Sequence, residues 1–124
     1  MRYRPICRNS EFSRVYTRGK NYVTPQLVMY VLKKKSGRTR VGLTATKKVG
    51  NAVKRNRARR VMRVAIAEHL DYDIGKYDLV FVARSSTPRL KSQQVSKAVA
   101  KLFKMAGLPD KALQEKPDAD ETHV

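Results

Sequence analysis

The 124-residue sequence contains no tryptophan, one cysteine, two histidines and only 10 acidic residues, against 28 lysines and arginines. The single cysteine, Cys7, excludes an internal disulfide and a cysteine-based metal site, and it favours a reducing compartment. No segment approaches the roughly 20 apolar residues of a membrane span, and the N-terminus lacks an apolar stretch of signal-peptide length. We therefore expect a cytoplasmic protein with no membrane partner.

The shortage of acids gives the chain a formal net charge of +18 at pH 7. Five of the acids lie in residues 109–124, so residues 1–108 hold 26 basic and 5 acidic residues, a net charge of +21. Such an excess repels itself unless a polyanion neutralises it, and nucleic acid is the first candidate. The length suits one domain, predicted at residues 1–108, and the acidic tail at 109–124 is predicted to be disordered.

Hydrophobic periodicity predicts the elements of the first half of that domain. NSEFSRVYTRG, residues 9–19, is typical of a short helix capped by Asn9 or Ser10, with an aromatic apolar face. The apolar run at residues 27–32 indicates a largely buried strand. RVGLTAT, residues 40–46, alternates between apolar and polar residues and is predicted to be the hairpin partner of that strand.

In the second half of the domain the hydrophobic period changes twice, from helix to strand and back to helix. Residues 51–70 repeat apolar residues with a period of 3.6, which predicts a helix with one apolar stripe and arginines on the far side. YDLVFVARS, residues 77–85, indicates a strand, and residues 92–107 indicate a final helix, capped by Ser92 and stopped by Gly107. This order of elements describes an α+β domain in which helices cover one small sheet.

The segment KKVGNAVKRNRARRVMR, residues 47–63, contains eight basic residues and no acid. Arginine presents a flat, permanently charged fork suited to phosphate, and Asn56 adds both a donor and an acceptor. On a helix Arg55 and Arg57 project about 100° to either side of Asn56, so this triplet covers a broad surface. The alternative is a solvated basic face without a specific partner. Ordinary solvent-exposed helices, however, usually interleave charges of both signs, and this segment does not.

The sequence RVGLTATKKVGNAVKRNRARRVMR resembles the signature of the bacterial ribonuclease P protein subunit, in which a strand and a basic turn lead into a helix bearing Arg-Asn-Arg. EFSRVYTRG resembles the first helix of that family, LVMYVLK its long strand and YDLVFVARS its last strand. The resemblance covers about residues 6–107. It implies a sheet of about four strands with three helices and a left-handed strand-helix-strand crossover (ribosomal protein S5 domain 2-like), although right-handed crossovers are the general rule.

The same resemblance implies a function. The protein would join a large catalytic RNA and precursor tRNA, and would assist removal of the 5′ leader, with Mg²⁺ used by the RNA. The positions that would face the catalytic RNA are Lys47, Lys48, Lys54, Arg55, Asn56, Arg57, Arg59, Arg60 and Arg63. No obligate protein partner is evident.

The resemblance also implies a cleft between the first helix and the sheet that holds the single-stranded leader. The matching positions are Phe12, Tyr16 and Tyr30, whose rings can stack on unpaired bases without demanding a sequence. Tyr16 stands where the family often has phenylalanine. From spacing alone, the alternative is that Phe12 and Tyr16 simply pack the helix onto the sheet, and the two roles are compatible.

We find no catalytic or metal-ligating constellation in the sequence. Asp71 and Asp73 flank a turn, and His69 falls on an apolar stripe, where a packed or capping histidine is expected. The chemistry is therefore expected to reside in the RNA subunit of a holoenzyme. The alternatives are a basic ribosomal or ribosome-assembly protein, and a nuclease that acts without RNA.

Overall fold

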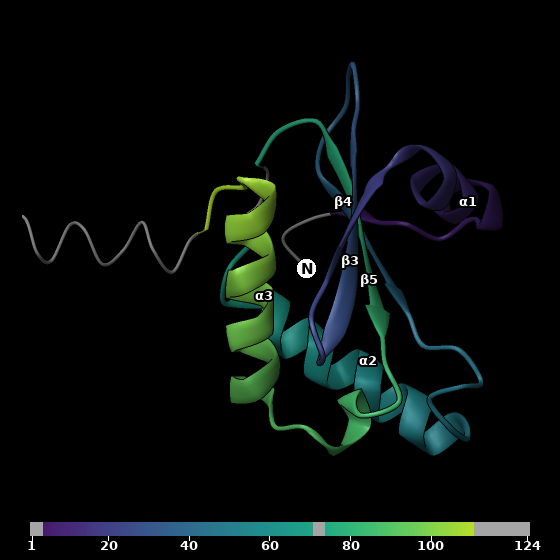
Figure 1. The fold of residues 1–124 in the computed structure, drawn as a ribbon. Coiled ribbons are helices and arrows are strands. Elements are labelled where there is room, and N and C mark those ends of the chain that lie inside the picture. Colours follow the sequence, from purple (N-terminus) through teal and green to yellow (C-terminus); the bar gives the residue numbers. More distant parts are fainter. Residues whose placement is uncertain (1–3, 71–73, 111–124) are drawn as a thin grey trace, which may run out of the picture.

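A computed structural model describes residues 4–70 and 74–110, and in this part of the chain one sheet is flanked by helices on both faces (Figure 1). The predicted α+β class is confirmed. None of the described helices is long and apolar enough to cross a membrane. The elements are β1 (Arg4–Pro5), α1 (Asn9–Arg18), β2 (Lys20–Val23), β3 (Leu27–Lys33), β4 (Arg40–Thr44), α2 (Ala52–Ala67), β5 (Tyr77–Ala83), the 3₁₀ turn η1 (Thr87–Arg89) and α3 (Ser92–Ala106).

The strands are arranged in the order β1-β4-β5-β3-β2. β5 lies between β3 and β4, antiparallel to the first and parallel to the second. The predicted hairpin between residues 27–32 and 40–46 is therefore wrong. The two segments are close in sequence, but β5, which arrives after α2, takes the position between them and pairs with both.

The sheet has five strands in the described residues, one more than the four expected. β1 has two residues and pairs with β4, and β2 has four residues and pairs antiparallel with β3. Strands this short have no alternating pattern long enough to recognise, because each contributes at most two side chains to either face.

The two faces of the sheet carry cores of different size. Alternate strand residues such as Met29, Leu79 and Phe81 point toward α2 and α3 and join the larger core. Tyr30 and Val80 point the other way, toward α1, in a smaller cluster. Figure 1 shows α1 on one side of the sheet, with α2 and α3 on the other. This alternation follows from the two-residue period of a strand.

The starts of α1 and α3 differ from the predicted caps. The Glu11 carboxylate and the Gln94 amide oxygen each accept a hydrogen bond from the backbone N–H three residues earlier, at 3.2 Å and 2.9 Å. Each acceptor belongs to a residue in the first turn of its helix and bonds back to the N-cap residue. The predicted capping by Asn9 or Ser10, and by Ser92, is therefore wrong.

The β4-α2-β5 unit joins two adjacent parallel strands through a helix. Its left-handed sense stays an expectation from the family resemblance. The apolar face of α2 contains Ala58, Met62, Ala65 and Ile66, all with no exposed surface.

His69 is buried just beyond the end of α2, as a packed histidine was predicted to be. Its Nδ1 lies 2.9 Å from the Asp110 carboxylate, and its Nε2 lies 2.7 Å from Ser96 Oγ on α3. Asp110, beyond the predicted domain boundary at 108, is 4% exposed and so packs against the domain. The remaining tail and the turn with Asp71 and Asp73 lie outside the described residues.

Candidate nucleic-acid interface

The basic segment begins in the turn between β4 and α2. Lys47 and Lys48 are exposed in this turn, while Val49 between them and the helix is buried and anchors it. The turn is closed by backbone hydrogen bonds from Val49 to Thr46 and from Gly50 to Lys47. Both lysines are thereby held at the entrance of α2.

The first turn of α2 combines a good cap with unfavourable charges. Asn51 Oδ1 accepts the backbone N–H of Lys54 at 3.0 Å, which satisfies one free amide. The first turn contains no acid to complement the positive end of the helix dipole, and Lys54 and Arg55 add charge of the same sign. An anion bound at this end would relieve that repulsion.

The arginines of α2 form two flanks on either side of Asn56. Arg55 and Arg59 are partly buried on one flank, and Arg57 and Arg60 are exposed on the other. Asn56 accepts a hydrogen bond from Arg59 Nη1 at 3.2 Å, so its side chain orients a neighbouring guanidinium. All nine predicted positions lie in the turn before α2 or on α2 itself, with Arg63 exposed at the far end.

In the described part of the chain, no salt bridge joins any cation of residues 47–63 to a carboxylate. Among the described residues these cations therefore have no carboxylate that offsets their charge. Most of them are also exposed. Because no carboxylate among the described residues holds them, an anion can bind without first breaking an internal ion pair. This arrangement suits a phosphate backbone, where each neutralised phosphate releases counterions and strengthens association at low salt.

The three aromatic residues predicted to touch a leader do lie together, on the α1 face of the sheet. The Tyr16 and Tyr30 rings meet edge to face with centroids 4.9 Å apart, and Phe12 follows at 6.4 Å from Tyr16. Tyr16 is 37% exposed, and its hydroxyl lies 2.8 Å from Thr44 Oγ1 on β4. This aromatic row (Phe12, Tyr16 and Tyr30) therefore combines packing with an exposed ring surface.

Gly42 on β4 is required by the position of Phe12. A Cβ at residue 42 would lie 2.5 Å from Phe12 Cε1 and 3.2 Å from Ile6 Cβ. Only glycine lets the Phe12 ring approach the strand this closely. The position of the aromatic row thus depends on a residue that carries no side chain.

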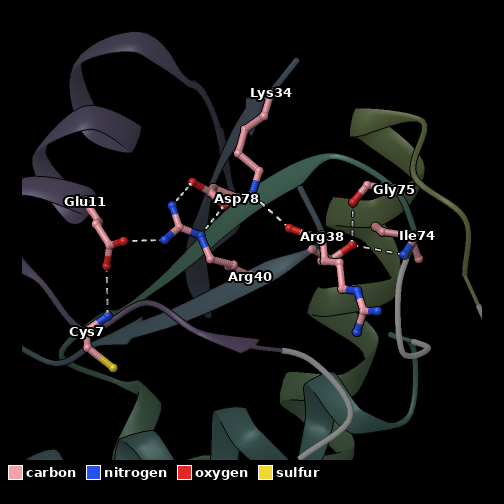
Figure 2. Close-up of polar contacts among 9 residues, drawn as sticks. Cys7, Glu11, Lys34, Arg38, Arg40, Ile74, Gly75 and Asp78 are labelled. Atoms are coloured by element: carbon pink, nitrogen blue, oxygen red, sulfur yellow. Dashed lines mark hydrogen bonds and ion pairs between the residues drawn. The ribbon is translucent and has the colours of Figure 1, made fainter. Parts of the chain in front are cut away.

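Beneath α1, four charged side chains form a cluster, the α1 ion-pair cluster (Glu11, Lys34, Arg40 and Asp78), shown in Figure 2. Arg40 donates to both oxygens of Asp78, at 3.0 Å and 2.8 Å, and also to Glu11. Lys34 Nζ approaches the same Asp78 carboxylate at 2.8 Å. The cluster connects α1 to β4, to β5 and to the residue that follows β3.

The cluster changes the acidity of its members. Burial raises the pKa of Asp78, but hydrogen bonds from Arg40 and Lys34 outweigh it, so the net pKa is lowered. The hydrogen bond from Arg40, with one from the backbone of Arg8, lowers the pKa of Glu11. The hydrogen bonds that Arg40 donates to Asp78 are also the main reason that the pKa of Arg40 is raised. All these charges are thus satisfied internally, unlike those of α2.

The Ribonuclease P family model matches residues 2–107. This chain belongs to the ribonuclease P protein family. The ribonuclease P protein components of Clostridium botulinum (strain Loch Maree) and Pelotomaculum thermopropionicum are 38% and 40% identical to it over 109 and 99 residues. These matches cover 87% and 80% of this chain, and 98% and 88% of the relatives. The resemblance inferred from the sequence is confirmed.

Solved structures agree with the family assignment. The Staphylococcus aureus RNase P protein has a TM-score of 0.68 and 27% identity, covering 82% of this chain and 94% of that one. The Thermotoga maritima RNase P protein has a TM-score of 0.62 at 19% identity, covering 82% and 96%, and supports the fold alone. In this chain, that fold carries both the basic segment and the aromatic row.

Two basic residues near the basic segment were not recognised from the sequence. Arg89 in η1 and Lys91 just after it line a hollow with Arg57 and Arg60 of α2. They lie about 30 residues away along the chain, among uncharged neighbours, so no local charge pattern marks them. Within the described residues, no group of three or more His, Cys, Asp or Glu side chains is arranged to hold a metal ion.

Proposed function

We propose that this ribonuclease P protein binds the catalytic RNA of ribonuclease P in the cytoplasm and assists it in removing the 5′ leader of precursor tRNA. The observation that carries the proposal is the unpaired basic face of α2 in a chain of this family. Eight cations in residues 47–63 meet no carboxylate among the described residues, so a polyanion is the partner that their charge requires.

The aromatic row supplies the second contact. The leader of a precursor tRNA is single-stranded, and stacking on an aromatic side chain contributes about 1–3 kcal/mol per base. Tyr16, 37% exposed and supported by Tyr30 and Phe12, offers a ring for such stacking on the face of the sheet opposite α2. One protein could thus contact catalytic RNA on one side and substrate on the other.

The proposed roles of the protein and of the RNA follow from the residues that the protein contains. The protein would lower the repulsion between two polyanions and position the leader, while the RNA and its bound Mg²⁺ would supply the chemistry. We therefore expect the protein to reduce the Mg²⁺ concentration that the RNA needs for cleavage. If about six cations met phosphates of duplex-like RNA, log affinity would fall with log salt at a slope of about −5.

The test is cleavage of a precursor tRNA at low Mg²⁺ by three samples: protein alone, a bacterial ribonuclease P RNA alone, and both together. We expect cleavage at the mature 5′ end only when both are present. A double variant, Arg55→Ala with Arg57→Ala, should lose most of the rescue, and Arg14→Ala with Arg18→Ala, two exposed positions on α1, serves as a matched control. If the double variant rescues cleavage as well as the unaltered protein does, the assignment of the RNA-facing surface is wrong.

The protein-alone sample also tests a second candidate, RNA degradation by the protein itself. A structurally similar Staphylococcus aureus RNase P protein mutant, with a TM-score of 0.70 and 27% identity, is described as having defective mRNA degradation activity. A single-stranded mRNA fragment should therefore be included as a substrate. Cleavage by purified protein without ribonuclease P RNA would favour this candidate.

A further inference from the structure

A groove separates α2 from the segment that joins β5 to α3. Two hollows of about 560 Å³ and 690 Å³ share Arg57, Pro88 and Arg89 in their linings and so form one continuous depression, the α2–η1 groove. Figure 1 shows η1 beside α2, close to the start of α3.

The groove has a basic rim and apolar walls. The cations come from both sides, and none of the residues that line the groove in the described structure is acidic. Val53 and Val64, which are 75% and 50% exposed, belong to its lining. The cations that line it are Lys54, Arg57, Arg60, Arg89 and Lys91.

The η1 side of the groove is held in place before any ligand arrives. Thr87 is fully buried, its hydroxyl donates to the Gln26 carbonyl at 2.7 Å, and it accepts the backbone N–H of Arg84 at 2.8 Å. The first bond fixes η1 to the residue before β3, and the second closes the turn that follows β5. Because the opposite wall is a regular helix, binding requires little reorganisation of the backbone.

We propose that the α2–η1 groove receives one unpaired nucleotide of the catalytic RNA, an inference that rests on the proposed function. Phosphates alone would need only the charges, which an exposed helix face already provides. The apolar walls suit a base that has left its stack, while Arg57, Arg60 and Arg89 reach the phosphates on either side. Arginine guanidinium groups also stack on unpaired bases in RNA complexes.

The first test is the affinity of the protein for a bacterial ribonuclease P RNA in the absence of precursor tRNA. Arg89→Ala should weaken binding about tenfold, as expected for one charge-assisted contact of about 1.4 kcal/mol. Arg14→Ala removes the same charge from an exposed position on α1, on the other face of the sheet, and should change affinity by less than about twofold. Equal effects of the two variants would overturn the groove proposal.

The second test maps the contact on the RNA. A photo-crosslinker is attached to Gln93→Cys, which lines the groove, in a Cys7→Ser background that leaves no other thiol. We expect one dominant crosslink, at a nucleotide unpaired in the RNA, and its loss in the Arg89→Ala variant. Crosslinks spread along a paired helix would overturn the assignment of a flipped nucleotide.

These experiments distinguish failure of the proposed function from failure of the groove proposal. If the unaltered protein neither binds the RNA nor rescues its cleavage, the proposed function is wrong and the groove proposal with it. If the unaltered protein does both while Arg89→Ala is indistinguishable from it and no groove crosslink forms, only the groove proposal is wrong. Circular dichroism of each variant verifies that the fold is intact.

Discussion

The cations of the α1 ion-pair cluster and those of α2 have opposite surroundings. Beneath α1, Arg40 is shared by two carboxylates, and Lys34 approaches one of them. On α2, Arg57 and Arg60 have no ion-pair partner among the described residues. The comparison indicates that the α1 ion-pair cluster stabilises the fold, because its charges neutralise one another. The charges of α2 instead add electrostatic repulsion to the free protein.

The comparison predicts where substitutions affect stability and where they affect binding. Loss of one member of the α1 ion-pair cluster leaves its partners partly buried without compensation. Loss of an α2 arginine relieves repulsion and removes a contact to RNA. Each of the following predictions tests one side of this difference.

The largest effect on stability is expected for Asp78→Ala. The Asp78 side chain is 1% exposed, and its removal leaves Arg40 and Lys34 without their main acceptor. We expect a loss of about 3 kcal/mol in the free energy of unfolding, measured by urea denaturation. Arg63→Ala, from the basic segment, should change it by less than about 0.5 kcal/mol. Comparable losses in the two variants would remove the distinction between the faces.

Gly42→Ala should produce the next largest effect. The added methyl group would meet the Phe12 ring, which must move or displace α1, at a cost of about 2 kcal/mol. A smaller side chain in the double variant Gly42→Ala, Phe12→Leu should recover part of that loss, as a double-mutant cycle would reveal. Simple additivity of the two changes would show that the contact with Phe12 is not the cause.

Acidification should weaken the fold through the same cluster. The folded-state pKa values of Asp78 and Glu11 lie below their ordinary values, so the unfolded chain takes up protons first as the pH falls. The stability they contribute is fully present above about pH 5 and is lost as the pH falls through the folded pKa values. Denaturation curves between about pH 7 and pH 3 measure this dependence.

Two variants sharpen the acid measurement. Asp78→Ala should flatten the pH profile, because one of the two titrating groups is gone. The double variant Arg57→Ala, Arg60→Ala should keep the profile of the unaltered protein, since no carboxylate contacts these arginines in the described structure. A profile altered more by the arginine pair than by Asp78→Ala would contradict the comparison.

The smallest effect is expected for Tyr16→Phe. The change removes the hydrogen bond to Thr44 but keeps the ring and its contact with Tyr30. We expect a loss of about 0.5–1 kcal/mol in stability and little change in affinity for a single-stranded leader. Tyr16→Ala should weaken leader binding about tenfold or more, by removing one stacking surface. Fluorescence anisotropy with a labelled precursor tRNA distinguishes the two variants.

The sequence by itself determined the longer helices and strands of this protein and its basic segment. Periodicity located three helices and three of the strands because amphipathic patterns depend only on neighbours within a few turns or pleats. Runs of like charge are likewise local, so the order of residues 47–63 along the chain was enough to recognise them. The aromatic row required the family resemblance, since Tyr30 lies on a strand distant in sequence from Phe12 and Tyr16.

Only the tertiary structure decided which elements became neighbours. The position of β5 between β3 and β4 depends on pairing across more than 30 residues, where local patterns carry no information about partners. For the same reason Arg89 could not be assigned to the basic face of α2, and the ion pairs of Arg40 with Glu11 and Asp78 could not be foreseen. Whether a charge is neutralised or free depends on contacts that exist only once the chain has folded.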